Sequence, residues 1–367
     1  MAGRAARAAR AAALVGGVLG AWCATSCAPS GFAVQSTVDS VRILASSADT
    51  PYTTPGATVS LQVLAIDGRK SQPAPMSVYW LPFVCEDPPG DAYYACFQEL
   101  LQAADGGAGA DGGAGGGAGT GALGQLKPGV DLTPFLPSGP TYQFTMPADA
   151  VSAHSTITGQ TPYGLAILFN IACAGHLELV PFDPSNDNPQ QVPLGCFDAS
   201  HTQLGPDDYV LGFTRVYAYA PSDLPANTNP TIGSIDLAGK TMSVTPATGA
   251  AYVSPGFTST PCDPNSSQSC QDVPIGPVVP ASSQESYTLP GTGATNEEIW
   301  ASFYTNLGSF SDEARLLYDA TAGLVGDPSV TDAKWTPPTE AGDGFIWIVV
   351  HDNRGGASWA TIPVHVQ

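Results

Sequence analysis

Basic residues are scarce in this sequence, where 12 Lys+Arg stand against 32 Asp+Glu and there are only five His. Proteins that bind nucleic acid or anionic lipid headgroups present clustered Lys and Arg, so this balance argues against both partners. The acidic excess is compatible with divalent cations. The carboxylates are scattered along the chain, however, and solubility accounts for them more simply.

The sequence also has no apolar run long enough to cross a bilayer as a helix, which takes about 20 residues. Its longest uncharged apolar run near the start covers residues 11–22 and follows a basic head of Arg4, Arg7 and Arg10. Because the apolar core of a signal peptide is about 7–15 residues long, we expect residues 1–26 to be a cleavable secretion signal.

The tetrapeptide Ala24-Thr25-Ser26-Cys27 follows this apolar core and resembles a bacterial lipobox, although that motif prefers Leu where Ala24 stands. The resemblance implies that Cys27 is acylated, becomes the mature N-terminus and anchors the protein to a membrane. The alternative is ordinary cleavage nearby, which would leave Cys27 as a free or removed thiol and the protein secreted. Residues 27–37 would then form a tether. Because three Arg leave with the signal, nine Lys+Arg would remain against 32 Asp+Glu, a net charge of about −23.

Motifs of the common catalytic classes are missing. No Gly-x-Ser-x-Gly, His-Glu-x-x-His or EF-hand loop occurs. His176 and Glu178 would share one face of a strand, as an acid/base or metal pair, but such spacing often arises by chance. We therefore predict no catalytic residue, no metal and no cofactor. Calcium bound through Asp312, Asp343 or Asp352 is an alternative hypothesis.

Six cysteines remain after Cys27, and they are Cys85, Cys96, Cys173, Cys196, Cys262 and Cys270. An even number in an exported chain indicates disulfides, for which fifteen pairings are formally possible. Sequence proximity favours 85–96, 173–196 and 262–270. Zinc is the competing interpretation, but the clustered Cys-x-x-Cys or Cys/His spacings that it needs are absent.

Short β-branched and aromatic runs with period-two alternation, separated by Gly, Pro, Ser and Thr, predict an all-β protein. The continuously apolar run 163–175 is typical of a central strand that is buried on both faces. The expected strands cover 40–48, 57–68, 77–85, 142–146, 163–175, 207–220, 231–240, 297–310, 333–338, 344–356 and 357–367. One short helix is expected at 95–104.

The chain divides into two expected domains, 38–222 and 231–367, joined by the Pro/Asn-rich linker 223–230. The Gly-rich segment 104–124 cannot bury enough apolar surface to fold, so we interpret it as a surface insertion in the first domain. Adjacent acidic pairs, Asp207-Asp208 and Glu297-Glu298, are expected to be solvated strand starts.

The C-terminal segments IWASFYTNLGSF, WTPP and FIWIVVHDNRGGASWATIPVHV resemble the PKD-type and bacterial Ig-like domains of cell-surface proteins. Segments of the first half, such as SVRILASSADTPYTTPGATVSL and LGPDDYVLGFTRVYAYA, are similar to predicted lipoproteins of Gram-negative bacteria. The resemblance implies two Ig-like β-sandwiches in tandem in the cell envelope, anchored to the outer membrane. It implies no activity.

Three functions compete at this stage. The first is a non-enzymatic lipoprotein, held on the membrane by its lipid, whose Ig-like domains serve as a scaffold or adhesion module. The second is a glycan- or protein-binding component of an envelope or secretion system. Its sugar platform would come from the aromatic residues Tyr217, Tyr219, Trp300, Tyr304, Trp347 and Trp359, which we expect mostly in the core, with Trp359 the least buried. The third is an enzyme with a dispersed site.

Overall fold

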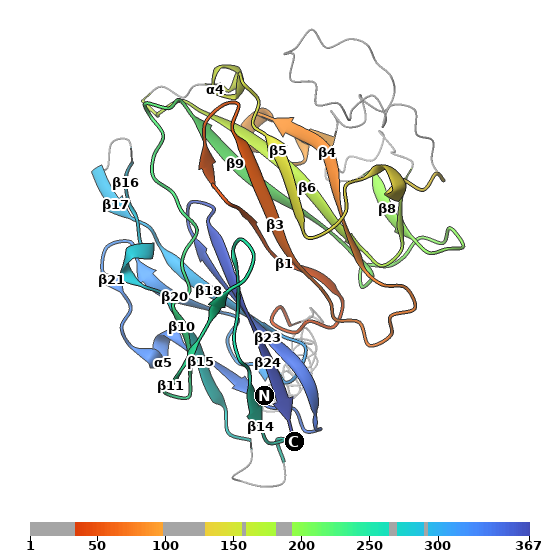
Figure 1. Ribbon diagram of the computed structural model, residues 1–367, viewed down its shortest axis with the longest axis vertical. Coiled ribbons are helices and arrows are strands. Elements are labelled where there is room, and N and C mark those ends of the chain that lie inside the picture. Colours follow the sequence, from red (N-terminus) through yellow and green to blue (C-terminus); the bar gives the residue numbers. More distant parts are fainter. Residues whose placement is uncertain (1–33, 98–128, 156–158, 181–192, 264–269, 290–292) are drawn as a thin grey trace, which may run out of the picture. The chain divides into compact units, whose positions relative to one another are not determined.

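The structure is a computed structural model that describes residues 34–97, 129–155, 159–180, 193–263, 270–289 and 293–367. These residues form strands joined by turns and a few short helical segments (Figure 1). The short segments are η1 (Pro89–Asp91), η2 (Thr133–Phe135), α4 (Ala150–Ala153), η3 (Ala281–Ser283) and α5 (Pro328–Thr331). Within the described ranges, no helix has the length and apolarity needed to cross a membrane. Because strands predominate and the helical segments are short, the predicted all-β class is confirmed.

The first half of the described chain forms two sheets that we call the N-terminal sheet pair. One sheet has the order β1-β3-β5, and the other has the order β2-β9-β6-β4. Their strands are β1 (Val41–Ala48), β2 (Tyr52–Thr53), β3 (Thr58–Asp67), β4 (Ser77–Glu86), β5 (Thr141–Thr145), β6 (Tyr163–Cys173) and β9 (Tyr209–Tyr219). A separate small hairpin consists of β7 (His176–Leu179) and β8 (Leu194–Phe197).

The second half forms the C-terminal sheet pair. The orders are β11-β10-β15-β22-β19 in one sheet and β12-β13-β24-β23-β18-β20-β21 in the other, with β14 also on β24. The first of these contains β10 (Ser234–Leu237), β11 (Lys240–Ser243), β15 (Val273–Val278), β19 (Ser309–Phe310) and β22 (Ala333–Thr336). The second contains β12 (Thr245–Pro246), β13 (Ala251–Val253), β14 (Phe257–Ser259), β18 (Ile299–Thr305), β20 (Ala314–Asp319), β21 (Gly323–Leu324), β23 (Gly342–Asp352) and β24 (Ala357–Val366). A hairpin of β16 (Ser286–Leu289) and β17 (Gly293–Asn296) completes this half.

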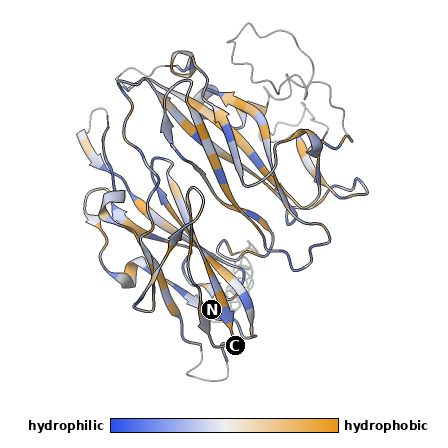
Figure 2. Cartoon of the chain, in the orientation of Figure 1, coloured by the Kyte–Doolittle hydropathy of each residue, from blue (hydrophilic) through white to orange (hydrophobic). Residues whose placement is uncertain are grey.

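Each sheet pair encloses its own apolar core, as two-layer β structures require. In the N-terminal pair, residues such as Leu61 of β3 and Trp80 of β4 pack between the sheets. In the C-terminal pair, residues such as Trp335 of β22 and Ile348 of β23 do the same. Figure 2 shows hydrophobic and hydrophilic positions alternating along many of the strands.

Strand β6 has two buried faces, as its apolar sequence predicts. Residues 164–173 are all buried. Alternate side chains point into the inter-sheet core, while Phe169 and its neighbours on the other face pack under Phe97, Leu132 and Leu177. The β7–β8 hairpin and the segment around η2 therefore cover the outer face of the β2-β9-β6-β4 sheet.

The expected strands are mostly observed, with two kinds of departure. The expected strand 231–240 is wrong as a single strand, because Ala238 and Gly239 adopt positive φ and turn the chain from β10 into β11. The expected strand 297–310 is divided into β18 and β19. Ala95–Phe97 are helical, and the rest of the expected helix lies outside the described residues, as do the Gly-rich insertion 104–124 and the expected signal 1–26 with Cys27.

Residues 35–367 form a single compact unit by their contacts, and both sheet pairs belong to it. The division into domains 38–222 and 231–367 stays a prediction. The reason for the continuity is the interface between the sheet pairs, which we call the junction.

Candidate functional site

The junction has an apolar centre built from the outer faces of both sheet pairs. Leu44 and Ala45 of β1 lie in one cluster with Trp347 and Val349 of β23 and Trp359 of β24. All five are buried. Strands β23 and β24 are therefore covered on both faces, by their own core on one side and by β1 on the other.

Polar contacts close the edge of this apolar centre. Ser47 Oγ donates a hydrogen bond to the carbonyl of Ala357 at 2.8 Å. Asn229, from the expected linker, donates from Nδ2 to the Ala48 carbonyl at 2.7 Å and accepts from Ala357 N–H at 2.9 Å. One side chain thus ties the end of β1 to the start of β24.

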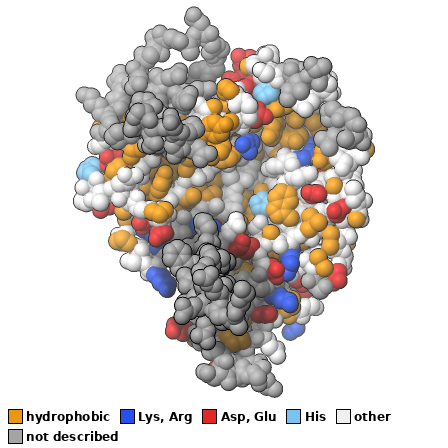
Figure 3. Space-filling view, turned by 180° about the vertical axis from the view of Figure 1, so that it is seen from behind, with side chains coloured by type: hydrophobic (Ala, Val, Ile, Leu, Met, Phe, Trp, Pro, Cys, Tyr) orange, Lys and Arg blue, Asp and Glu red, His pale blue; other side chains and the backbone are white. Residues whose placement is uncertain are grey.

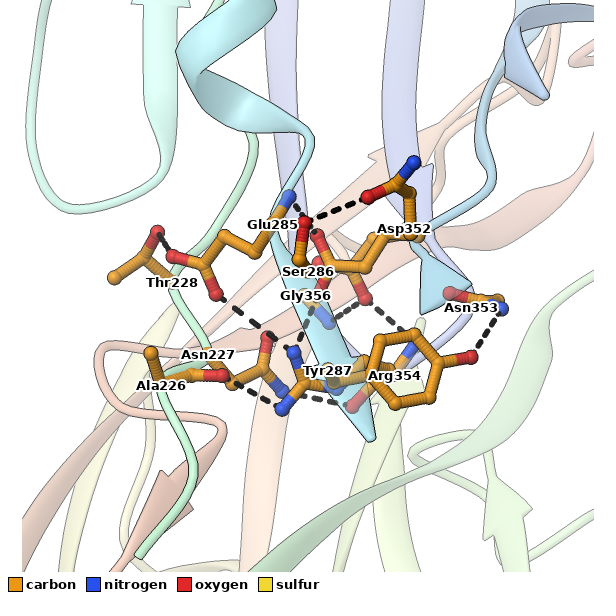
Figure 4. Close-up of polar contacts among 12 residues, drawn as sticks. Ala226, Asn227, Thr228, Glu285, Ser286, Tyr287, Asp352, Asn353, Arg354 and Gly356 are labelled. Carbon is orange, nitrogen blue, oxygen red and sulfur yellow. Dashed lines mark hydrogen bonds and ion pairs between the residues drawn. The ribbon is translucent and has the colours of Figure 1, made fainter. Parts of the chain in front are cut away.

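The turn between β23 and β24 places Arg354 at the same junction (Figure 4). Asp352 Oδ1 accepts hydrogen bonds from the N–H groups of Arg354 and Gly356, both at 2.8 Å. Gly355 has φ +97°, and a Cβ on Gly356 would lie 2.0 Å from Asp352 Oδ2. The turn therefore favours glycine at both 355 and 356.

The guanidinium of Arg354 is almost fully enclosed, with 4% of the side chain exposed. It lies 4.8 Å from the ring centre of Tyr52 and 4.7 Å from that of Tyr287, an arrangement that cation–π attraction stabilises. Its Nη1 donates to Glu297 Oε1 at 2.9 Å, and its Nη2 donates to the Ala226 carbonyl at 2.6 Å. Arg354 therefore contacts the N-terminal sheet pair, the linker and the C-terminal sheet pair.

Three carboxylates surround this single guanidinium, and their charges are not balanced by it. Burial raises the pKa of Glu297 to about 7, and the nearby Asp352 and Glu285 carboxylates add to the effect, which Arg354 only partly offsets. Burial also raises the pKa of Asp352. The expectation that Glu297 is a solvated strand start is wrong, because its side chain is fully buried beside Arg354.

A polar groove of about 880 Å³ runs along the junction, and it is our candidate functional site. Most of its lining side chains are neutral and polar, and Asp49 is the one charged residue among them. The lining consists of Ser47, Asp49, Ser60, Leu61, Gln62, Thr141, Tyr142, Gln143, Asn229, Pro230, Thr248, Gly249, Ala250, Tyr252 and Ser358.

Hydrogen bonds and stacking hold several of these lining groups in place. Gln62 Oε1 accepts from Ala250 N–H at 3.0 Å, which joins β3 to the loop before β13. Gln143 Nε2 donates to Ser60 Oγ at 3.0 Å. The ring of Tyr142 stacks on Trp80 with centroids 5.4 Å apart. The groove therefore presents hydroxyl and amide groups at fixed positions.

A second polar cluster lies on the β7–β8 hairpin, far along the chain from the groove residues of β1 and β24. His176 Nε2 and His201 Nδ1 each lie 2.6 Å from Glu178 Oε1. The sequence indicates the pairing of His176 with Glu178 through their i, i+2 spacing. It gives no signal for His201, which comes from the loop after β8.

The other residues considered from sequence are dispersed. Asp312 pairs with Arg315, Asp343 pairs with His365, and Asp352 holds the Arg354 turn, so each of the three has a separate structural partner. Trp300 stacks on His351, and Tyr217 and Tyr219 pack near Tyr52. Trp347, Trp359 and Tyr304 are buried in the junction. The expectation that Trp359 is the least buried aromatic is wrong, because β1 covers its face of the sheet.

Three disulfides join Cys85 to Cys96, Cys173 to Cys196 and Cys262 to Cys270. This is the pairing that sequence proximity favours. The first two disulfides are buried and belong to the apolar layer over β6. Asp208, expected to be solvated, accepts a hydrogen bond from Arg69 Nη1 at 2.8 Å.

Charge on the visible surface forms no single patch. Figure 3 shows acidic side chains scattered over the face that it presents, among fewer basic ones. This distribution fits the scattered carboxylates of the sequence.

Comparisons with known proteins identify no family for this chain. No protein-family model matches the chain, and no curated protein matches it. Among solved structures, the chain is similar to the C-terminal domain of the antigen I/II-family protein AspA of Streptococcus pyogenes, with 9% sequence identity and a TM-score of 0.17. That alignment covers 89% of this chain and 100% of the other. A TM-score this low carries no argument about fold or function.

Proposed function

We propose that this protein is an extracytoplasmic, membrane-anchored scaffold or interaction module that binds a neutral, polar ligand in the junction groove. The ligand class that the groove favours is an oligosaccharide. The proposed function is binding, and the protein would favour it by holding the groove walls rigid before the ligand arrives.

The observation that carries the proposal is the composition and position of the groove. Its lining is mostly hydroxyl and amide side chains, among them Ser60, Gln62 and Gln143. Hydroxyl and amide groups both donate and accept hydrogen bonds, which matches the hydroxyl groups of a sugar. A strongly charged ligand finds little complementary charge there, since Asp49 is the only ionisable acid or base in the lining.

The junction contacts support binding because they fix the groove walls before a ligand arrives. The walls come from β3, β5, the linker and the loop before β13. Asn229 and Gln62 each hydrogen-bond across these segments. A preformed site avoids the entropy cost of ordering its walls on binding, which favours affinity.

Extracytoplasmic location is supported by the three disulfides, because such bonds persist mainly in oxidising compartments. The membrane anchor rests on the lipobox-like sequence ending at Cys27. An acyl chain contributes about 0.8 kcal/mol per buried methylene, so several chains on one cysteine would hold the protein on a membrane.

Screening the purified protein on an array of neutral and charged oligosaccharides tests the proposed binding. We expect it to bind a neutral class. Gln143→Ala removes an exposed amide from the groove, and Thr248→Trp fills part of it with a large ring. Each should weaken binding at least about tenfold, which corresponds to about 1.4 kcal/mol.

The matched control is Gln72→Ala, an exposed glutamine in the loop after β3 that does not line the groove. It should bind as the wild type does. Absence of binding to any neutral oligosaccharide, or equal losses in the groove variants and in Gln72→Ala, would contradict the proposal.

A further inference from the structure

The β7–β8 hairpin and the following loop bring two imidazoles onto one carboxylate oxygen. His176 Nε2 and His201 Nδ1 both lie 2.6 Å from Glu178 Oε1, and the three potential ligand atoms all lie within 4.8 Å of one another. Within the described ranges, this is the one group of three or more His, Cys, Asp or Glu residues that meets such a distance criterion.

The carboxylate of Glu178 is buried, with 3% of the side chain exposed. A buried carboxylate needs a compensating charge or strong hydrogen bonds. The ion pairs of Glu178 in the described chain are with these histidines, and neither Lys nor Arg takes part.

The backbone around this cluster is fixed by several independent restraints. His176 and Glu178 lie on the same face of β7, and β8 is joined to the end of β6 by the Cys173–Cys196 disulfide. Asp198 Oδ1 accepts hydrogen bonds from the N–H groups of Ser200 and Thr202 at 2.8 and 2.9 Å. This loop therefore presents His201 in one defined orientation.

His201 itself has an uncommon backbone conformation. Its φ is +60°, a region that residues other than glycine rarely adopt and that is uncommon enough to indicate a local requirement. Its side chain is 60% exposed, yet Nδ1 points back to Glu178. An exposed imidazole whose Nδ1 faces a buried carboxylate suits a ligand position that solvent can reach.

We propose that His176, Glu178 and His201 form a binding site for a divalent transition-metal ion, with Zn²⁺ as the ion that fits best. Two imidazole nitrogens and one carboxylate oxygen are a ligand set that Zn²⁺ takes in proteins, and a fourth position would remain for solvent or another molecule. This site is separate from the junction groove, and it does not depend on the proposed sugar binding.

The chemistry of loading is simple. Each histidine would coordinate through the nitrogen that now faces Glu178, and the proton of that hydrogen bond would pass to the other ring nitrogen or to solvent. The present separations of 2.6 Å are those of hydrogen bonds. Ligand atoms around a tetrahedral Zn²⁺ lie about 3.3 Å apart, so each histidine nitrogen would move less than about 1 Å away from the Glu178 oxygen.

Zinc titration of the purified, disulfide-intact protein against a chromophoric chelator tests the site. We expect one equivalent of Zn²⁺ to bind, and Co²⁺ to give the visible absorption of a tetrahedral site. His201→Asn should weaken Zn²⁺ binding at least about a hundredfold, because loss of a residue that only hydrogen-bonds to a metal ligand already costs about 10–100-fold. Asparagine tolerates positive φ, so this variant should keep the loop conformation.

Glu178→Gln gives a second variant with the same expected loss, and His365→Asn is the control. His365 also faces a carboxylate, with Nδ1 2.5 Å from Asp343 Oδ1, but it has no second histidine beside it among the described residues. If Glu178→Gln fails to fold, His201→Asn decides alone, with circular dichroism to show that it folds. The site is refuted if the wild type takes up no Zn²⁺ at micromolar concentration, or if His201→Asn binds it as tightly as His365→Asn does.

Discussion

Arg354 lies between two tyrosine rings and three carboxylates, where it contacts both sheet pairs and the linker. Removing one partner of a buried, hydrogen-bonded charge cluster leaves the others uncompensated, which costs more than the contact itself contributes. The residue therefore stabilises the junction mainly by making the burial of Glu297 and Asp352 tolerable.

Stability should depend on pH through Glu297. The pKa of this carboxyl is raised from 4.5 to about 7, first by burial and then by its acidic neighbours Asp352 and Glu285. Between these two values the folded protein holds a proton that the unfolded chain releases, so its stability is greatest at the acid end of this window. It falls as pH rises through about 7.

The whole effect on the free energy of unfolding is at most about 3 kcal/mol, because one pKa unit corresponds to about 1.4 kcal/mol. Urea unfolding of the wild type and of Glu297→Gln between about pH 5 and pH 8 measures it. The variant should show a flatter dependence. Glu298→Gln, at the adjacent and exposed position, should follow the wild type, and a Glu297→Gln profile as steep as that of the wild type would refute this role.

Residue-level prediction from the sequence works where local spacing carries the signal. The i, i+2 spacing of His176 and Glu178 indicates a shared face, and the glycines after Arg354 indicate a turn. His201, Glu297 and Trp359 obtain their roles from partners that are remote in sequence. Only the tertiary fold brings His201 to Glu178, Arg354 to Glu297 and β1 to Trp359.

At the scale of the element, strands with buried or alternating faces are predictable. Strand β6 has a continuous apolar sequence because both of its faces are covered. The short strands β2, β8, β12, β13 and β14 carry too few residues for a period to be visible. Of these, β2, β13 and β14 pair in parallel with the longer strands β9 and β24, whereas β8 and β12 pair with the short strands β7 and β13.

The β7–β8 hairpin should depend strongly on its disulfide. Cys173 and Cys196 are 23 residues apart and fully buried over β6. Replacing both with serine should lower the free energy of unfolding by about 3 kcal/mol, through the lost restraint on the unfolded chain. It should also weaken Zn²⁺ binding, since β7 carries two of the proposed ligands.

The control for this prediction is the double serine variant at Cys262 and Cys270, which are only 8 residues apart. A shorter loop gives a smaller entropic restraint, so a loss of about 2 kcal/mol is expected, with unchanged Zn²⁺ affinity. Equal losses of Zn²⁺ affinity in the two double variants would contradict the proposed link between the hairpin and the metal site.

At the scale of the whole molecule, two β-sheet pairs are held in one unit by an apolar junction with a polar rim. Sequence patterns predict the all-β class and most of the long strands of each pair. The junction is not predictable in this way, because strands such as β23 and β24 have the same apolar sequence whether their outer face packs on a ligand, a partner or the chain itself. We propose that the polar groove along this junction binds a ligand.

The proposed role on a membrane depends on export followed by lipid attachment at Cys27, which decides where the groove is presented. Metabolic labelling of cells with a fatty-acid analogue, for the wild type and for Cys27→Ala, tests this directly. We expect the wild type to carry the label and to fractionate with membranes, and Cys27→Ala to lose the label and appear in the soluble fraction. An unlabelled wild type, or the same label and fractionation in both proteins, would contradict lipid attachment at Cys27.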